Sequence, residues 1–409
     1  MILRLSQYKE DCAMKYDFET VHKRFNTGSG KWCEMAKYGV SESDDIIPFS
    51  VADMEFVTPP EIVDAIKTQL DTSIMGYENP TPEYLAAVCE WMRVRRNWDA
   101  KPEWILPSNG VVDAFFRAVQ TYTCEGDGVM IMTPVYHPMY MAVNFNGRKL
   151  VSNPLINTGT RYEIDFADME RRASDPNTKM LILCSPHNPV GRVWTRDELT
   201  RIGEICLRHD VLVVSDEIHF DLIMPGHVHT VFASISDEFA QNCLVMTAPS
   251  KTFNIAGLQT SNIFIPNKSL REKYLASLKL SNPNPKCNIL GYVACEAGYK
   301  FCGEWLDECL KVIDANRRVI TDFMAHEFPA VKVHVLEGTY LLWLDLRGLG
   351  LGHKELERVN REEARLFFDE GYVFGEQGEC FERWNIACPE RYVRGALERM
   401  KECYSRHMK

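Results

Sequence analysis

Four short apolar runs between residues 104 and 265 show no alternation of hydrophobic and polar positions. Uninterrupted runs of this length are typical of parallel strands that are buried on both faces of a sheet. Amphipathic stretches such as residues 195–209 lie between the runs and have the length of crossover helices. The pattern predicts an α/β fold with a doubly wound, mostly parallel sheet. The four runs are residues 129–132, 180–184, 211–214 and 244–246.

The flanking sequence predicts further helices and a second, smaller domain. Helices are expected to begin just after the capping hydroxyls of Thr58 and Thr81, each of which precedes a proline. The prolines at 283 and 285 break the chain ahead of a long helical region at about 290–326. Residues 340–345 and 381–386 are expected to be strands of an α+β domain.

We therefore divide the chain into three parts. Residues 1–47 are expected to form a leading helix and loop that join the small domain, with residues 26–31 as a connection ahead of Trp32. Residues 48–288 form the large domain of the prediction, and residues 289–409 form the small C-terminal domain.

Charge and composition exclude several classes of function. Lys and Arg number 46 against 57 Asp and Glu, and the net charge of −11 gives nucleic-acid binding no electrostatic support. No apolar run approaches the roughly 18 residues of a membrane span, and the first residues lack the apolar core of a signal peptide. We therefore expect a cytoplasmic protein.

The 14 cysteines are scattered and show no spacing that suits zinc, so no metal site is expected. Cys295, Cys302 and Cys309 recur every seven residues, which predicts one shared helix face. They are expected to be small buried hydrophobes in a reducing compartment.

Polar or aromatic side chains follow each of the four apolar runs. Because the carboxyl ends of parallel strands meet at one edge of a sheet, these side chains are expected to converge on one crevice. In chain order they are Tyr136, Asn188, Asp216 with His219, and Ser250 with Lys251.

This set of side chains points to one cofactor. An aromatic face suits a ring, a carboxylate suits a ring nitrogen that must be protonated, and a lysine suits a carbonyl that can be trapped as an imine. Together they describe pyridoxal 5'-phosphate (PLP). Gly110, Val111 and Val112 open a predicted helix and would offer backbone amides to the phosphate, and Ser250 could add a hydroxyl.

Six stretches that span nearly the whole chain also carry a resemblance to a known family. The chain resembles the class I/II aminotransferases of fold type I, and within them the cystathionine β-lyase (C–S lyase) branch. The resemblance implies a three-layer, doubly wound PLP enzyme. The stretches are residues 51–56, 186–194, 215–219, 250–259, 337–340 and 383–387.

The resemblance implies a role for each residue at the strand ends. Lys251 would bind the cofactor covalently and then move the substrate α-proton, and Asp216 would keep the ring nitrogen protonated. Asn188 and His219 would hydrogen-bond the ring hydroxyl oxygen, and Tyr136 would stack on the ring. Structural roles stay open for His219 as a core histidine and for Tyr136 as a packing aromatic.

The resemblance also implies a substrate site and a partner subunit. Arg383 would bind the substrate α-carboxylate, together with Asn188, unless it is a surface cation. Tyr77 resembles a tyrosine that reaches the phosphate of the neighbouring subunit, which implies a homodimer with shared active sites. Asn109 and Cys380 depart from the proline and glycine of the family pattern, and Gln259 stands where broader aminotransferases carry an arginine.

Three functions follow from these expectations. The leading hypothesis is a PLP-dependent C–S β-lyase, an enzyme that cleaves cystathionine, cysteine or an S-conjugate to a thiol, pyruvate and ammonia. The second is an aminotransferase that uses the same site. The third is a regulatory binding protein built on the fold of a PLP enzyme.

Overall fold

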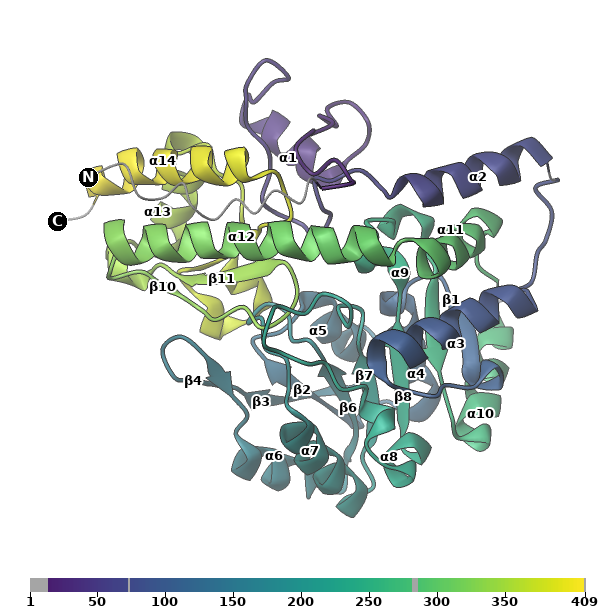
Figure 1. Cartoon of the computed structure of the whole chain (residues 1–409). Helices are drawn as coiled ribbons and strands as arrows, with labels where there is room; N and C mark the ends of the chain where they lie inside the picture. Colours follow the sequence, from purple (N-terminus) through teal and green to yellow (C-terminus); the bar gives the residue numbers. More distant parts are fainter. Residues whose placement is uncertain (1–13, 73, 282–285, 408–409) are drawn as a thin grey trace.

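The centre of the protein is a seven-stranded sheet, seen in a computed structural model that describes residues 14–72, 74–281 and 286–407 (Figure 1). The strand order is β1-β9-β8-β7-β6-β2-β3. Five strands pair in parallel, whereas β9 runs antiparallel to both of its neighbours. This confirms the predicted mostly parallel sheet. The strands are β1 (Ile105–Ser108), β2 (Gly128–Thr133), β3 (Lys149–Pro154), β6 (Thr178–Cys184), β7 (Leu212–Asp216), β8 (Cys243–Thr247) and β9 (Ser261–Phe264).

The four predicted apolar runs are β2, β6, β7 and β8, and their two-sided burial explains the absence of alternation. In β2, Val129 and Ile131 belong to one hydrophobic cluster, whereas Met130 and Met132 belong to the other. Successive side chains point to opposite faces of a strand, so both faces must be apolar when helices cover both.

Helices cover both faces of this sheet and form the predicted three layers (Figure 1). One face packs against α4 (Val111–Tyr122), α5 (His137–Asn144) and α10 (Lys268–Ser281). The other packs against α6 (Phe166–Ala173), α7 (Arg196–Arg208) and α8 (Asp237–Gln241). Within the described ranges, no helix is both long and apolar enough to cross a membrane.

Two predicted helix starts are confirmed. The helix expected after Thr58 is α2 (Pro60–Thr72), and the one expected after Thr81 is α3 (Pro82–Arg96). The Thr81 hydroxyl accepts a hydrogen bond from Tyr84 N at 3.1 Å, which satisfies a backbone donor of the first turn.

The helical region expected at about 290–326 is present and consists of two helices, which corrects the prediction of one shared face for its cysteines. They are α11 (Ile289–Phe301) and α12 (Gly303–Glu327). Cys302 separates them with φ −103° and ψ 22°, which lies outside helical geometry, so Cys295, Cys302 and Cys309 do not share one continuous helix face. All three are buried, as expected of small hydrophobes. The predicted break at 283–285 lies outside the described residues.

A second, smaller sheet has four antiparallel strands in the order β10-β11-β13-β12. The strands expected at 340–345 and 381–386 are its two central strands. Figure 1 shows α12 beside α14 (Glu390–His407) next to this sheet. The strands are β10 (Lys332–Val333), β11 (Leu341–Asp345), β12 (Asp369–Glu370) and β13 (Phe381–Asn385), and a separate hairpin is formed by β4 (Ile156–Asn157) and β5 (Tyr162–Glu163).

The described part of the N-terminal segment contains α1 (Gly30–Lys37), so the expectation of a plain connection at 26–31 is wrong at its end. Lys31 is buried in this helix, 2.5 Å from the Glu55 carboxylate, and that ion pair holds the helix against the chain. Phe49 N, two residues beyond this segment, donates to Phe367 O, which links the chain there to the region of the small sheet. Any helix within residues 1–13 lies outside the described residues, and the boundaries at 47 and 288 stay predictions.

Candidate active site

A cavity of about 320 Å³ lies at the carboxyl edge of the large sheet. The loops that follow five strands of that sheet supply most of its lining, and β13 of the small sheet supplies Arg383. Ten of the eleven predicted site residues line it, so the expected convergence at the strand ends is present. They are Gly110, Val111, Val112, Tyr136, Asn188, Asp216, His219, Ser250, Lys251 and Arg383.

Lys251 lies in α9 (Pro249–Thr252), the short helix that follows β8. Its Nζ donates to Ala52 O at 2.8 Å. Burial lowers the pKa of Lys251 from 10.5 to about 8; the Asp53 carboxylate opposes this shift, and the Arg383 and Lys31 cations add to it. An amine with a pKa of about 8 is partly neutral near pH 7, which is the form that attacks a carbonyl.

Asp216 is the last residue of β7 and is 3% exposed. Its Oδ1 accepts a hydrogen bond from Ile218 N at 3.1 Å. Burial raises the pKa of Asp216 from 3.8 to about 7, with a smaller contribution from Glu217, whereas the Ile218 bond and the Lys251 charge lower it. Asp216 lines the cavity, and the charges near it compensate its own charge only weakly. A buried carboxyl of this kind is suited to pair with a cationic ring nitrogen of a ligand.

Arg383 holds its guanidinium in the cavity wall through two contacts. Nη1 donates to Asn188 Oδ1 at 3.0 Å, and Nη2 pairs with Asp369 Oδ2 at 2.5 Å. The guanidinium also lies 4.6 Å from the ring centre of Phe374. Arg383 Nε is buried and has no hydrogen-bond partner among the described residues, so the fork retains a donor for a ligand.

His219 is 3% exposed, and its Nδ1 is buried with no hydrogen-bond partner in the described part of the chain. Burial and the Lys251 and Arg383 cations lower the pKa of His219 well below its ordinary value, so the ring is neutral and one of its nitrogens can donate to an oxygen. A neutral imidazole with an unused polar atom at a cavity wall is suited to bind a ligand hydroxyl.

Another part of the cavity lining comes from the start of α4. Gly110 is the N-cap residue with φ 106°, a conformation that side-chain-bearing residues rarely adopt. The amides of Val111 and Val112 follow it in the first turn, where helix N–H groups have no intrahelical partner and attract anions. Ser250, 7% exposed, adds a hydroxyl to the cavity lining.

Tyr136 lies between β2 and α5 and is partly buried at the cavity. Its backbone N donates to Asn188 O at 3.1 Å, which ties two of the site loops together. Tyr77 is the one predicted residue that does not line this cavity. It is 94% exposed and lines a neighbouring hollow of about 790 Å³ with Asn109 and Gln259, and both of these also line the first cavity.

Sequence reasoning missed several residues that hold the site. Ala52 O accepts from both Lys251 Nζ and the Tyr340 hydroxyl, the latter at 2.6 Å. Asp369 pairs with Arg383 across the β12–β13 register. Residues 51–56 and 337–340 had been noted for their resemblance to the family without a role for Ala52 or Tyr340, whereas nothing local to Asp369 predicts its partner 14 residues away.

Cys380, where the family pattern has a glycine, keeps the loop ahead of Arg383 in a glycine-like path. Its φ is 60°, and its carbonyl accepts a hydrogen bond from Leu346 N at 3.0 Å. The departure from the pattern therefore adds local backbone strain without moving β13 out of register with β11.

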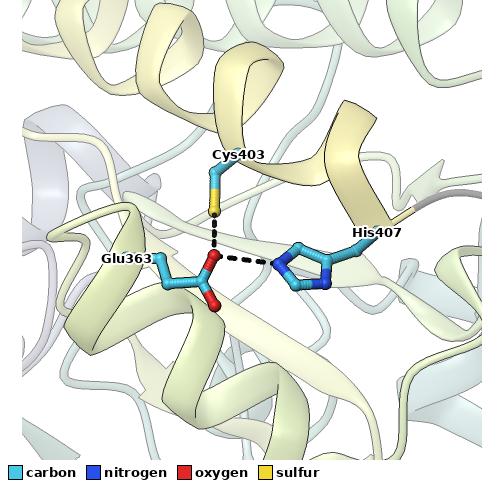
Figure 2. A group of neighbouring side chains, drawn as sticks. All are labelled: Glu363, Cys403 and His407. Atoms are coloured by element: carbon cyan, nitrogen blue, oxygen red, sulfur yellow. Dashed lines mark hydrogen bonds and ion pairs between the residues drawn. The ribbon is translucent and has the colours of Figure 1, made fainter.

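A separate group of side chains lies on the small domain, where Glu363, Cys403 and His407 are close enough to surround an ion (Figure 2). The Cys403 Sγ lies 3.6 Å from Glu363 Oε2, and His407 Nε2 lies 2.9 Å from the same oxygen. Arg358 Nη2 is 2.6 Å from the other carboxylate oxygen. Cys403 and His407 stand four residues apart on α14, a spacing that the cysteine pattern had not brought out. Because an arginine already pairs with the Glu363 carboxylate, we interpret the contacts among these three side chains as structural: they hold α14 against residues 359–363.

Comparison with known proteins gives consistent results along most of the chain. Residues 44–400 match the family model described as aminotransferase class I and II. The chain is 43% identical to the cystathionine β-lyase PatB of Bacillus subtilis, over 95% of this chain and 100% of the relative, and 31% identical to the protein MalY of Escherichia coli, over 94% and 99%. The crystal structure of cystalysin from Treponema denticola, which contains a PLP cofactor, superposes with a TM-score of 0.93 at 46% identity, over 96% of this chain and 100% of that one.

Proposed function

This chain belongs to the aminotransferase class I and II family, a PLP-dependent family, and on that premise we propose that it is a C–S β-lyase. The reaction takes a cysteine S-conjugate such as cystathionine and water, and yields a thiol, pyruvate and ammonia. The observation that carries the proposal is one cavity lined by both Lys251 and Asp216. The relative named cystathionine β-lyase, at 43% identity over nearly the full length of both chains, supports the choice of reaction.

The residues present fit the cofactor. The raised pKa of the Asp216 carboxyl and the unpartnered Nδ1 of His219 leave two buried polar groups that a pyridinium nitrogen and a ring hydroxyl would satisfy. The first turn of α4 would hold the phosphate, and Tyr136 would lie against the ring. Lys251 would hold the aldehyde carbon. When bound, the cofactor supplies an electron sink that acidifies the substrate α-proton and allows the β-substituent to leave.

Lys251 is the proton carrier of the reaction. Its amine, with a pKa of about 8, accepts the α-proton in the neutral form. The resulting ammonium can then donate a proton to the departing sulfur, so that the C–S bond breaks and the thiol leaves uncharged. Ala52 O and the cavity wall hold Nζ in place between these transfers, because Nζ already donates to that carbonyl at 2.8 Å.

Arg383 and Asn188 orient the substrate. Arg383 is 4% exposed and lines the cavity, so a carboxylate bound there is shielded from water and its attraction to the guanidinium fork is strong. The Asn188 amide contacts the same guanidinium and can turn its nitrogen to the carboxylate or to the ring hydroxyl. Fixing the carboxylate fixes the direction of the α-proton toward Lys251.

A product assay tests the proposal directly. The purified holoprotein is incubated with cystathionine, and thiol, pyruvate and ammonia are measured together. Equal amounts of the three products, with none from Lys251→Ala, are expected. A keto acid that retains the sulfur, formed without free thiol and with conversion of the cofactor to its amine form, would identify an aminotransferase instead.

We also propose a homodimer in which Tyr77 completes the partner's site. Ile74 is 88% and Tyr77 94% exposed, beside a hollow that reaches the phosphate end of the cavity through Asn109 and Gln259. Mixing Tyr77→Ala with Lys251→Ala subunits tests this, because heterodimers would contain one intact site and recover up to about one quarter of the wild-type activity. No recovery on subunit exchange would place Tyr77 in its own subunit's site or outside any site.

A cytoplasmic location is part of the same proposal. The 13 cysteines of the described residues are all free, and several are exposed or partly exposed. Free thiols in this number are typical of a reducing compartment.

A further inference from the structure

A second cavity of about 520 Å³ adjoins the first, and none of the proposed roles uses it. Ala256 lines both cavities. Asp53, on the wall of the second, directly follows Ala52, whose carbonyl holds Lys251 Nζ in the first. Burial lowers the pKa of Lys251, and among the surrounding charges the Asp53 carboxylate has the largest effect, which opposes that shift. The two cavities therefore meet at Ala256 and at the consecutive residues Ala52 and Asp53, beside the amine of Lys251.

The charged side chains on the wall of this cavity are not equally well paired. Glu55 forms a buried ion pair at 2.5 Å with Lys31, which lies behind the lining residues, and the two side chains are 3% and 1% exposed. Arg24 Nη2 reaches Glu55 Oε1 at 3.0 Å, but its Nη1 lies 3.5 Å from Asp53 Oδ2. The Arg24 and Asp53 side chains are each 32% exposed, so one cation and one anion face the cavity in a loose pair.

This loose pair has the polarity of a binding site for a zwitterion. A carboxylate can take a short, charge-assisted contact from Arg24, and an ammonium group can give one to Asp53. Each of these contacts would be shorter than the 3.5 Å that now separates the two side chains. Glu55 would keep its buried partner Lys31, so no charge is left unpaired in the wall when Arg24 turns to a ligand.

We propose that the second cavity binds the distal amino-acid end of a thioether substrate, with Arg24 on its carboxylate and Asp53 on its ammonium group. The proposal rests on the C–S lyase function and names its substrate class: S-conjugates of cysteine whose sulfur substituent ends in an amino-acid group, as in cystathionine. Val57 and Phe56 line the same cavity and offer apolar surface to the methylene groups between sulfur and the distal carbon. Cysteine and S-alkylcysteines lack the distal charges and gain nothing from the site.

Three substrates distinguish the contribution of the Arg24–carboxylate contact from that of the Asp53–ammonium contact. Cystathionine carries both distal charges, S-(3-carboxypropyl)cysteine lacks only the distal amine, and S-propylcysteine lacks both. Asp53→Asn is expected to lower the ratio of kcat/KM for cystathionine to that for S-(3-carboxypropyl)cysteine by about 10-fold or more. Arg24→Gln is expected to lower, by a similar factor, the ratio of kcat/KM for either substrate with a distal carboxylate to kcat/KM for S-propylcysteine. Arg24→Lys is expected to restore part of this ratio.

Ratios are the readout because Asp53 also influences Lys251, an effect that all three substrates share. Matched controls are Asp64→Asn and Arg93→Gln, which remove the same groups from exposed ion pairs on α2 and α3 and should leave both ratios unchanged. Isothermal titration calorimetry of the three ligands with the same variants in a Lys251→Ala holoprotein gives the ratio of Kd values without turnover.

The outcomes distinguish this proposal from the proposed function. Thiol release with ratios that Asp53→Asn and Arg24→Gln do not change overturns the distal site and leaves the lyase standing. Absence of thiol from every substrate overturns the lyase, and the calorimetric ratios then decide whether the cavity still prefers a distal amino-acid group. An equal decrease in kcat/KM for all three substrates, with unchanged ratios of Kd values, assigns Arg24 and Asp53 a structural role only and also overturns the proposal.

Discussion

Replacing Asp216 with asparagine removes a buried carboxyl group that would pair with the cationic ring nitrogen of the bound cofactor. Asp216 is 3% exposed, and burial raises its pKa from 3.8 to about 7. Between these values the unfolded chain has lost the proton while the folded apoprotein keeps it, so rising pH destabilises the fold. Above pH 7 both states are ionised and the pKa difference corresponds to a constant penalty of about 4 kcal/mol.

Asparagine cannot ionise, so the apoprotein of Asp216→Asn should gain stability relative to the wild type as the pH rises from about 4 to about 7 and then keep a constant lead. In the holoprotein the sign reverses, because the wild-type carboxylate pairs with the cationic ring and the amide does not.

The measurement is urea unfolding followed by tryptophan fluorescence over this pH range, with and without PLP. Asp64→Asn, an exposed residue on α2, is the control and should show no comparable trend. A stability difference in the apoprotein that does not change with pH would refute the reasoning.

Three further results are expected. Covalent capture of PLP by the apoprotein, followed by stopped-flow absorbance, should accelerate with pH and level off above about 8, the pKa of Lys251; a plateau only near 10 would contradict the lowered value. Arg383→Lys keeps the charge but loses the fork, so KM for cystathionine should rise about 10-fold or more with a smaller change in kcat, and an unchanged KM in steady-state assays would argue against carboxylate binding. Gly110→Ala meets no atom within 4 Å but forces a side chain to φ 106°, so it should lower the unfolding free energy by about 1–2 kcal/mol and weaken PLP binding. Gly395→Ala, within α14 and equally unobstructed, should instead stabilise slightly; equal effects of the two substitutions in denaturant titrations would contradict the strain at Gly110.

Much of the fold and the site could be predicted because both depend on local patterns. The apolar runs at β2, β6, β7 and β8 identify strands buried on both faces, and a parallel sheet brings their carboxyl ends to one edge. That rule alone places Tyr136, Asn188, Asp216 and Lys251 around one cavity, which is where the structure has them.

The remaining features depend on contacts between distant parts of the chain. Asp369 pairs with Arg383 through strand register, and Lys31 becomes a buried partner of Glu55 only after the N-terminal segment has folded onto the chain. Neither pair has a signal in the residues next to it. The break at Cys302 does have a local signal, because Gly303 follows it and glycine weakens a helix interior.

Lys251 is, in the proposed function, the amine that holds the cofactor opposite Asp216 in this cavity. Reduction of the holoprotein with borohydride, followed by proteolysis and mass spectrometry, tests it directly. The mass of a reduced pyridoxyl phosphate group is expected on the peptide that contains Lys251 and on no other. The same mass on a different lysine, or on none, would contradict it.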